Sequence, residues 1–362
     1  MSIIQNWFRR NSSDPQVVLL VLVVVFLVGI IWWVGDSLAP VLAAVIFAYL
    51  LQGAVNRLER RGMPHLGSVM LVFLGFILAA AFVLLALLPL LVRQISDLAT
   101  RLPAIARKVQ DLLLRLPESY PSLISEDQVR NVMERLSQEA LGGTQWLLSY
   151  SLTSVVAAMT LLVYLILVPF LVFFLLKDRA VILGWLTSFL PAERPLADRV
   201  WNEINHQLAG YVRGKFWEIA IVAAVSWAVF VALGLEYAAL LGAVTGLSVL
   251  IPYIGAAVIT LPVAAVGYFQ WGLSLDFAWV VLAYAVIQAL DGNVLAPLLL
   301  GGAVNVHPVA VIIAILFFGG IWGFWGVFFA IPLAGVVHAI IESWPRESES
   351  PEPVIESDGE EG

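Results

Sequence analysis

Long apolar runs dominate this sequence and alternate with short polar segments. The first three runs cover residues 17–34, 38–55 and 66–92. Each is long enough for a helix to cross a bilayer core, which takes about 17–25 residues. Only a Gly-Asp-Ser tripeptide at 35–37 separates the first two runs. This pattern predicts three membrane spans, with a tight turn between the first and the second.

Arginines predict the orientation of these spans. Two arginines precede the first run and three lie in the loop at 57–61, whereas the turn at 35–37 has no basic residue. Cationic segments favour the cytoplasmic side of a membrane. The pattern therefore predicts a cytoplasmic N-terminus and places residues 93–150 outside.

The external region has a helical pattern of its own. Apolar residues recur every three or four positions from Ile95 to Leu116, which predicts an amphipathic helix that Pro103 kinks or divides. A second amphipathic segment follows at 126–148. These helices could pack on the protein's own spans, form a subunit contact or cover a pore mouth, and the sequence leaves the three interpretations open.

A fourth apolar run occupies residues 151–176. The basic residues that follow place residues 177–215 on the cytoplasmic side. Apolar residues three or four positions apart from Leu196 to Tyr211 predict an amphipathic helix at the cytoplasmic interface. A fifth span is predicted at 216–233.

Glycine and proline interrupt the apolar runs of the second half. A straight helix over 238–269 would be about 48 Å long, which is too long for one simple crossing. This run breaks at 251–255 (Ile-Pro-Tyr-Ile-Gly), and the run at 309–341 is interrupted at 319–326. Two architectures fit. Broken but continuous spans give eight crossings and a cytoplasmic C-terminus, or one of the two runs folds back as a re-entrant hairpin.

Asp291 is the most deeply placed carboxylate of the second half, within a Gly- and Pro-containing stretch at 288–308. A charged group at membrane depth is costly and is usually functional. We therefore predict that the backbone opens there into a polar site, where three interruptions converge on one cavity. The alternatives are a polar loop at the membrane surface and a helix N-cap role for Asp291. The candidate substrate- or ion-binding residues are Pro252, Gly255, Asp291, Asn293, Pro297, His307, Gly319, Gly320 and Gly323.

Composition supports an all-α, polytopic integral membrane protein of about eight membrane segments. Of the 362 residues, 61% are hydrophobic and only 12% are charged, unlike a soluble domain. The net charge of −7 resides in the last 21 residues, which hold eight acidic residues and one arginine. This composition predicts a disordered, solvated tail.

The pattern divides the chain into five regions. They are a three-span region (1–92), external amphipathic helices (93–150), a fourth span with a cytoplasmic helix (151–215), a transport region with interrupted helices (216–341) and the acidic tail (342–362).

Enzyme chemistry has no support in the sequence. It contains no phosphate-binding loop, no HExxH motif and no cysteine, and its four histidines are scattered. It also lacks the basic patch of a nucleic-acid-binding protein. We therefore expect no catalytic residue, no metal, no cofactor and no nucleic-acid partner.

Seven segments in order resemble the autoinducer-2 exporter (PerM-like permease) family. They lie at 38–51, 56–62, 173–179, 211–215, 251–255 and 291–297, followed by a set comprising His307-Pro308, the glycines of 319–326 and Ile331-Pro332. The chain departs from the family pattern at Gln52-Gly53, where Asn-Pro is common, and at Lys215, where Gln is common.

The resemblance implies a secondary transporter in the inner membrane of a bacterium, drawn with eight segments and forming homo-oligomers, with pentamers among them. It implies export of autoinducer-2 by some relatives and sodium or lithium exchange for protons by others. We therefore expect a secondary-active transporter that exports a small polar signalling molecule or metabolite. The alternatives are a monovalent cation/proton antiporter and a membrane scaffold that binds partner proteins.

Overall fold

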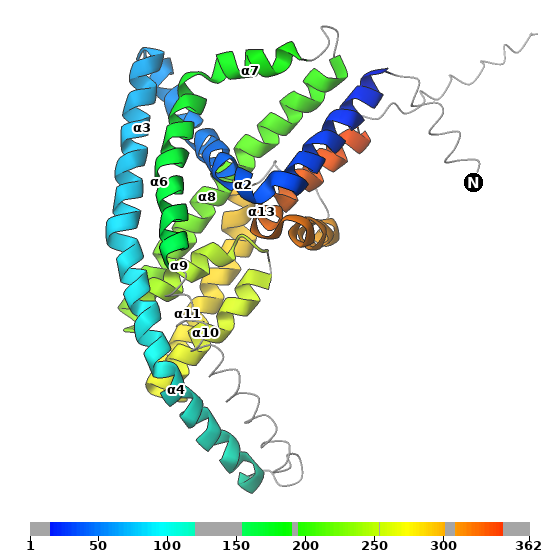
Figure 1. Ribbon diagram of the computed structural model, residues 1–362. Helices are drawn as coiled ribbons and strands as arrows, with labels where there is room; N and C mark the ends of the chain where they lie inside the picture. Colours follow the sequence, from blue (N-terminus) through cyan, green and yellow to red (C-terminus); the bar gives the residue numbers. More distant parts are fainter. Residues whose placement is uncertain (1–14, 120–153, 190–194, 253, 301–307, 343–362) are drawn as a thin grey trace, which may run out of the picture.

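A computed structural model describes residues 15–119, 154–189, 195–252, 254–300 and 308–342. Every regular element within these ranges is a helix (Figure 1), which confirms the all-α prediction. Six helices of the described part are long and apolar enough to cross a membrane, and a seventh span results if one bent pair is counted. The protein is thus a polytopic membrane protein. The number of about eight segments stays a prediction, because part of the chain lies outside the described residues.

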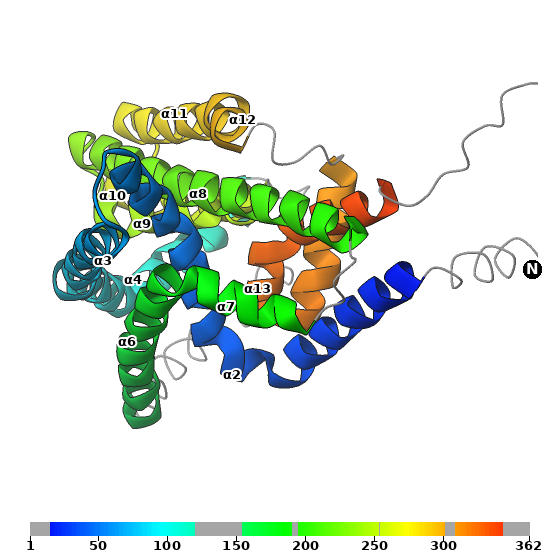
Figure 2. The same ribbon diagram turned by 90° about the horizontal axis from the view of Figure 1, so that it is seen from above.

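The first two predicted spans form one helical element, α2 (Pro15–Arg60). The predicted turn at 35–37 is wrong, since helical structure continues through it. Pro40 lies inside this helix. The ribbon of α2 bends near its middle (Figures 1 and 2), as expected where a proline removes a backbone hydrogen bond.

The third predicted span continues into a helical column of three parts. These are α3 (His65–Phe82), a π-helical turn η1 (Val83–Leu87) and α4 (Leu88–Ser119). Pro103 does not divide α4, so the expected division of this helix is wrong, while a kink at Pro103 stays a prediction. The second amphipathic segment at 126–148 and the acidic tail lie outside the described residues.

The fourth predicted span is α6 (Ser154–Lys177), which bends by 81° into the short helix α7 (Arg179–Ser188). Helices α2, α3 and α6 pack together over one apolar core. Its buried members are Ala44, Val55, Val69, Val168, Val172 and Leu176.

Helix α8 (Pro195–Ala232) organises the second half of the molecule. It joins the predicted cytoplasmic helix and the predicted fifth span into one element, whose apolar part covers Gln207–Ala232. It contacts α2, α9, α11, α12 and α13. Figure 2 shows α8 running across the molecule with α11 and α12 along one side.

The predicted break at 251–255 is confirmed. Helix α9 (Ala238–Ser248) ends before it, and α10 (Ile254–Trp271) begins within it. A β-carbon at Gly255 would collide with the carbonyl oxygen of Ser248, so only glycine allows this tight connection.

The run with Asp291 is one helical column. It comprises α11 (Leu275–Leu290), the π-helical turn η2 (Asp291–Leu295) and α12 (Ala296–Leu300). Ser274 caps its start by accepting a hydrogen bond from the amide of Phe277. The column is apolar and long enough to count as a membrane span.

Helix α13 (Pro308–Glu342) folds back on itself at Gly323, where φ is 57°. A β-carbon at Gly326 would collide with the carbonyl oxygen of Phe318. In a straight helix, residues eight positions apart are separated by about 12 Å along the axis. The segments on either side of Gly323 therefore contact each other at the bend, which favours the re-entrant hairpin for the 309–341 run.

Candidate transport site

A buried ion pair lies in the middle of α8. The Nζ atom of Lys215 is 3.0 Å from Oε2 of Glu218, and the two side chains are only 2% and 3% exposed. The i,i+3 spacing places both side chains on one face of the helix. Both residues belong to the apolar part of α8, where a charged group without a partner would be costly.

Asp291 faces α8 close to this pair. Ile287, four positions before it, belongs to one buried cluster with Val222 of α8, and Leu295, four positions after it, packs against that cluster. The carboxylate of Asp291 interacts electrostatically with the Lys215 ammonium and with Glu218. Its Oδ1 atom is buried and has no hydrogen-bond partner among the described residues.

The helix is wider than an α-helix at Asp291, but its backbone hydrogen bonding continues. The amide of Ala296 donates to the carbonyl oxygen of Asp291, which is the five-residue spacing of a π-turn. Pro297 follows directly and has no N–H to continue the regular α-helical pattern. The Asn293 side-chain amide donates to the carbonyl oxygen of Ala289 at 2.8 Å. Asp291 neither caps a helix start nor lies in a surface loop, so both alternatives are wrong.

Two glycine contacts bring helices close to the ion pair. A β-carbon at Gly214 would lie 2.5 Å from the carbonyl oxygen of Leu299 in α12. On the next turn, Gly246 of α9 approaches the carbonyl oxygen of Ile219, where a β-carbon would be 2.7 Å away. The two contacts leave α8 enclosed on two sides at Lys215 and Glu218.

The other predicted site residues flank a different, apolar cluster on α8. Ile251, Leu300 and Phe318, which adjoin the three interruptions, all pack against the core around Tyr211. The interruptions therefore converge on α8, but their shared contact is apolar. Their convergence on one cavity stays a prediction.

The individual predicted residues lie as follows. Pro252 and Gly255 form the connection between α9 and α10, Asn293 and Pro297 are exposed on η2 and α12, and Gly319, Gly320 and Gly323 form the bend of α13. His307 lies outside the described residues. Within the described part of the chain, no group of three or more His, Cys, Asp or Glu side chains could hold a metal ion.

Comparison with known proteins places the chain in a family. The profile described as "AI-2E family transporter" matches residues 20–346, which is most of the sequence. The chain belongs to the AI-2E transporter family. It is therefore a member of a family of transporters and not of enzymes.

Named relatives agree with this assignment. Over 359 residues, the chain is 41% identical to a protein named permease PerM from Escherichia coli (strain K12), covering 95% of this chain and 98% of the relative. It is 28% identical over 307 residues to a transport protein named YueF from Bacillus subtilis (strain 168), covering 83% and 82% of the two chains. A transport protein of Methanothermobacter thermautotrophicus is 24% identical over 307 residues, covering 84% and 87%.

Sequence reasoning missed the ion pair of this AI-2E family transporter. Neither Lys215 nor Glu218 was among the predicted site residues, but the structure buries both. The signal was present as a Lys-x-x-Glu spacing next to an apolar run. A helix that buries one of these residues also buries the other, because the spacing puts them on one face.

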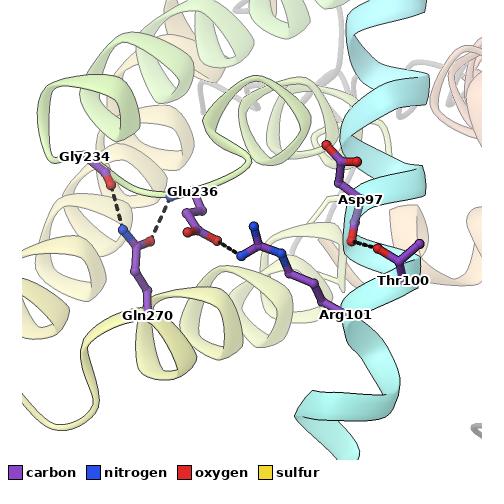
Figure 3. A network of polar contacts seen from close by, with 6 residues as sticks. All are labelled: Asp97, Thr100, Arg101, Gly234, Glu236 and Gln270. Carbon is purple, nitrogen blue, oxygen red and sulfur yellow. Dashed lines mark hydrogen bonds and ion pairs between the residues drawn. The ribbon is translucent and has the colours of Figure 1, made fainter.

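A second polar cluster of this AI-2E family member lies just beyond the end of α8 (Figure 3). Arg101 of α4 reaches Glu236 in the turn before α9, with 2.7 Å between Nη1 and Oε2. Gln270 of α10 accepts from the Glu236 amide and donates to the carbonyl oxygen of Gly234. The two charged side chains are 59% and 45% exposed, so this cluster joins three helices at a solvated or headgroup surface and is not a buried site.

Proposed function

We propose that this AI-2E family transporter is a secondary-active exporter of a small polar solute, a signalling molecule or metabolite, and that Asp291 binds it. The observation that carries the proposal is the buried charge between two apolar helices. One ammonium and two carboxylates lie there, and one carboxylate oxygen has no hydrogen-bond partner among the described residues. Ionisable groups inside membrane-spanning helices typically mark substrate or ion pathways.

The proposed setting is the inner membrane of a bacterium. The arginines before the first apolar run and at 57–61 support a cytoplasmic N-terminus. We also propose a homo-oligomer, with a pentamer as the form implied by the family resemblance. In its support, α3 exposes an apolar surface, including Leu74, Leu78 and Phe82, which is available to lipid or to a second copy of this chain.

Monovalent cation/proton antiport is the second candidate. A specific observation favours it, because Lys215, Glu218 and Asp291 together carry a net charge of −1 when all are ionised. Such a site balances one sodium ion, one lithium ion or one proton. Export of a neutral solute would instead use the same carboxylate as a hydrogen-bond acceptor.

Flux through proteoliposomes tests these candidates. The purified protein is assayed with autoinducer-2, with sodium-22 and with lithium under a proton gradient, and Asp291→Asn is compared with wild type. We expect autoinducer-2 efflux that falls at least tenfold in the variant. Asp276→Asn is the matched control, because Asp276 lies in the exposed first turn of the same helical column, and its flux should stay within about twofold of wild type.

Each outcome favours one candidate. Proton-coupled sodium or lithium flux that is abolished by Asp291→Asn, without efflux of autoinducer-2, supports antiport and contradicts export of this solute. If a well-folded protein moves none of these solutes while partner proteins co-purify through residues 93–150, the scaffold interpretation gains and the transport proposal fails.

A further inference from the structure

The charged site has one base for two acids. Lys215 carries three N–H donors on a flexible four-carbon chain, and its ion pair among the described residues is with Glu218. Asp291 is the second acid at this site, because η2 contacts α8 and the buried Oδ1 atom of Asp291 has no hydrogen-bond partner among the described residues. Tyr211 also interacts electrostatically with Glu218, but its hydroxyl donates to the carbonyl oxygen of Phe328 at 3.0 Å. The Tyr211 hydroxyl hydrogen is already bound to Phe328 and therefore cannot be donated to Asp291 in this arrangement.

The packing keeps the three groups together. The contact of Gly214 with Leu299 fixes the distance between α8 and α12 one residue before Lys215. Ile287 and Leu295 pack in the apolar cluster that contains Val222, which turns the Asp291 side of η2 towards α8. Neither helix can therefore withdraw one acid from the lysine without breaking well-packed contacts.

We infer that Lys215 is a tethered counter-ion shared by Glu218 and Asp291, and that its ammonium moves from Glu218 to Asp291 when the transported species leaves Asp291. This inference deepens the proposed function and rests on it for the identity of the transported species. The structure shows the lysine on Glu218, which is the arrangement that leaves Asp291 free for a ligand. A buried carboxylate without a counter-charge or hydrogen-bond donor is strongly unfavourable. The lysine supplies that counter-charge in the empty carrier, and a proton bound by Glu218 then keeps the released carboxyl group neutral.

The movement of the Lys215 ammonium between the two carboxylates also restricts what the site can bind. Because one ammonium serves two carboxylates, one carboxylate always needs an outside partner. The geometry points to a ligand that offers one positive charge or one hydrogen-bond donor to Asp291. Binding a divalent cation would leave the enclosed site with a net charge of +1.

A stability cycle tests the sharing without any knowledge of the substrate. Thermal unfolding of the purified full-length protein in detergent is compared for wild type, Asp291→Asn, Lys215→Gln and the double variant. If the lysine serves both acids, Asp291→Asn should change the midpoint by less than about 1 °C in wild type and raise it by several degrees in the Lys215→Gln background. An equal shift in both backgrounds overturns the inference.

The Lys215→Gln variant could fail to fold, because it leaves Glu218 buried and unpaired. The cycle is therefore repeated in the Lys215→Gln/Glu218→Gln background, which removes both charges of the pair and keeps similar side-chain volumes. Adding Asp291→Asn there should again raise the midpoint by several degrees, since it removes the remaining uncompensated charge. No rise in this background contradicts a counter-ion role.

Transport gives an independent readout. Lys215→Gln should lower net efflux at least tenfold, because the empty carrier then has to reorient with a bare carboxylate. Exchange with the same solute on both sides should fall by a clearly smaller factor than net efflux, since Asp291 is occupied in both directions of exchange. Autoinducer-2 and sodium-22 serve as probes, with Lys215→Arg as the charge-conserving control.

Equal losses of net efflux and exchange overturn the inference and indicate a structural role for the lysine. If wild type transports neither probe, the proposed function fails for these solutes. The stability cycle still decides whether Lys215 is shared.

Discussion

The two π-helical turns of this transporter have the same backbone and different surroundings. Turn η1 (Val83–Leu87) and turn η2 (Asp291–Leu295) each end at a residue whose amide donates to the first residue of the turn. In both, a proline follows that residue, Pro89 in one case and Pro297 in the other. The shared cause is that proline lacks an N–H and its ring clashes with the carbonyl four residues earlier, which a wider turn relieves.

Their side chains set the two turns apart. Turn η1 reads Val-Leu-Leu-Ala-Leu and projects apolar residues such as Leu85 outward, whereas η2 contains Asp291 and Asn293 and contacts α8. A proline in an apolar helix therefore predicts a backbone irregularity but not a site. The site arises only where a neighbouring helix brings the matching charge.

The largest expected effect comes from removing that charge. Lys215→Met leaves Glu218 and Asp291 without their base, and breaking a buried ion pair in this way costs about 3–5 kcal/mol. The loss is measured as a lower unfolding midpoint of the purified protein. Arg93→Met is the control near η1, because Arg93 is exposed, and its midpoint should stay within 1 °C of wild type. A midpoint equal to that of this control would show that the pair is dispensable.

The next largest effect is expected from substituting glycines, with Gly214 of α8 compared with Gly75 of α3. Gly214→Ala pushes a methyl group against the carbonyl oxygen of Leu299 and should destabilise the protein by about 1–3 kcal/mol. In α3, Gly75→Ala meets no atom within 4 Å and should be neutral or stabilise the helix by up to about 1 kcal/mol. Unfolding midpoints of the two variants give the comparison. Destabilisation by both would mean that the α8–α12 approach has no special role.

The prolines offer a sharper test of the two turns. Pro297→Ala restores an N–H, and a regular α-helical turn would rotate Asp291 relative to α8. We expect solute flux in proteoliposomes to fall about tenfold, which corresponds to an increase of about 1.4 kcal/mol in the activation free energy of transport. Pro89→Ala should leave flux within twofold, because no charged group depends on η1. Equal flux in both variants would show that the π-turn does not position Asp291.

The smallest effect is expected at the exposed cluster of Figure 3. Arg101→Ala removes the ion pair with Glu236, and exposed pairs contribute about 0–1 kcal/mol. The shift of the unfolding midpoint should be small and should vanish at high salt, since salt screens exposed charges. A large, salt-independent loss would place this cluster in a less solvated environment than its exposure indicates.

Local patterns predicted much of this molecule, and their failure at the first predicted turn has a physical cause. Pro252 and Gly255 predicted the break between α9 and α10 because both act on their own backbone. The same reasoning failed at 35–37, where helical structure continues. In lipid, an unpaired backbone group is costly, so a helix is maintained through residues that would end it in water.

The sequence by itself determined the membrane class, the helical content and the family, because hydrophobicity and motif order are local properties that add along the chain. It also marked Asp291, since a carboxylate in a long apolar run is costly wherever it lies. Only the tertiary structure decided that Lys215 and Glu218 are buried as a pair, that Asp291 faces them and that α13 folds back at Gly323. Charge pairing depends on distances between helices, and close glycine contacts across α8, α9 and α12 set those distances.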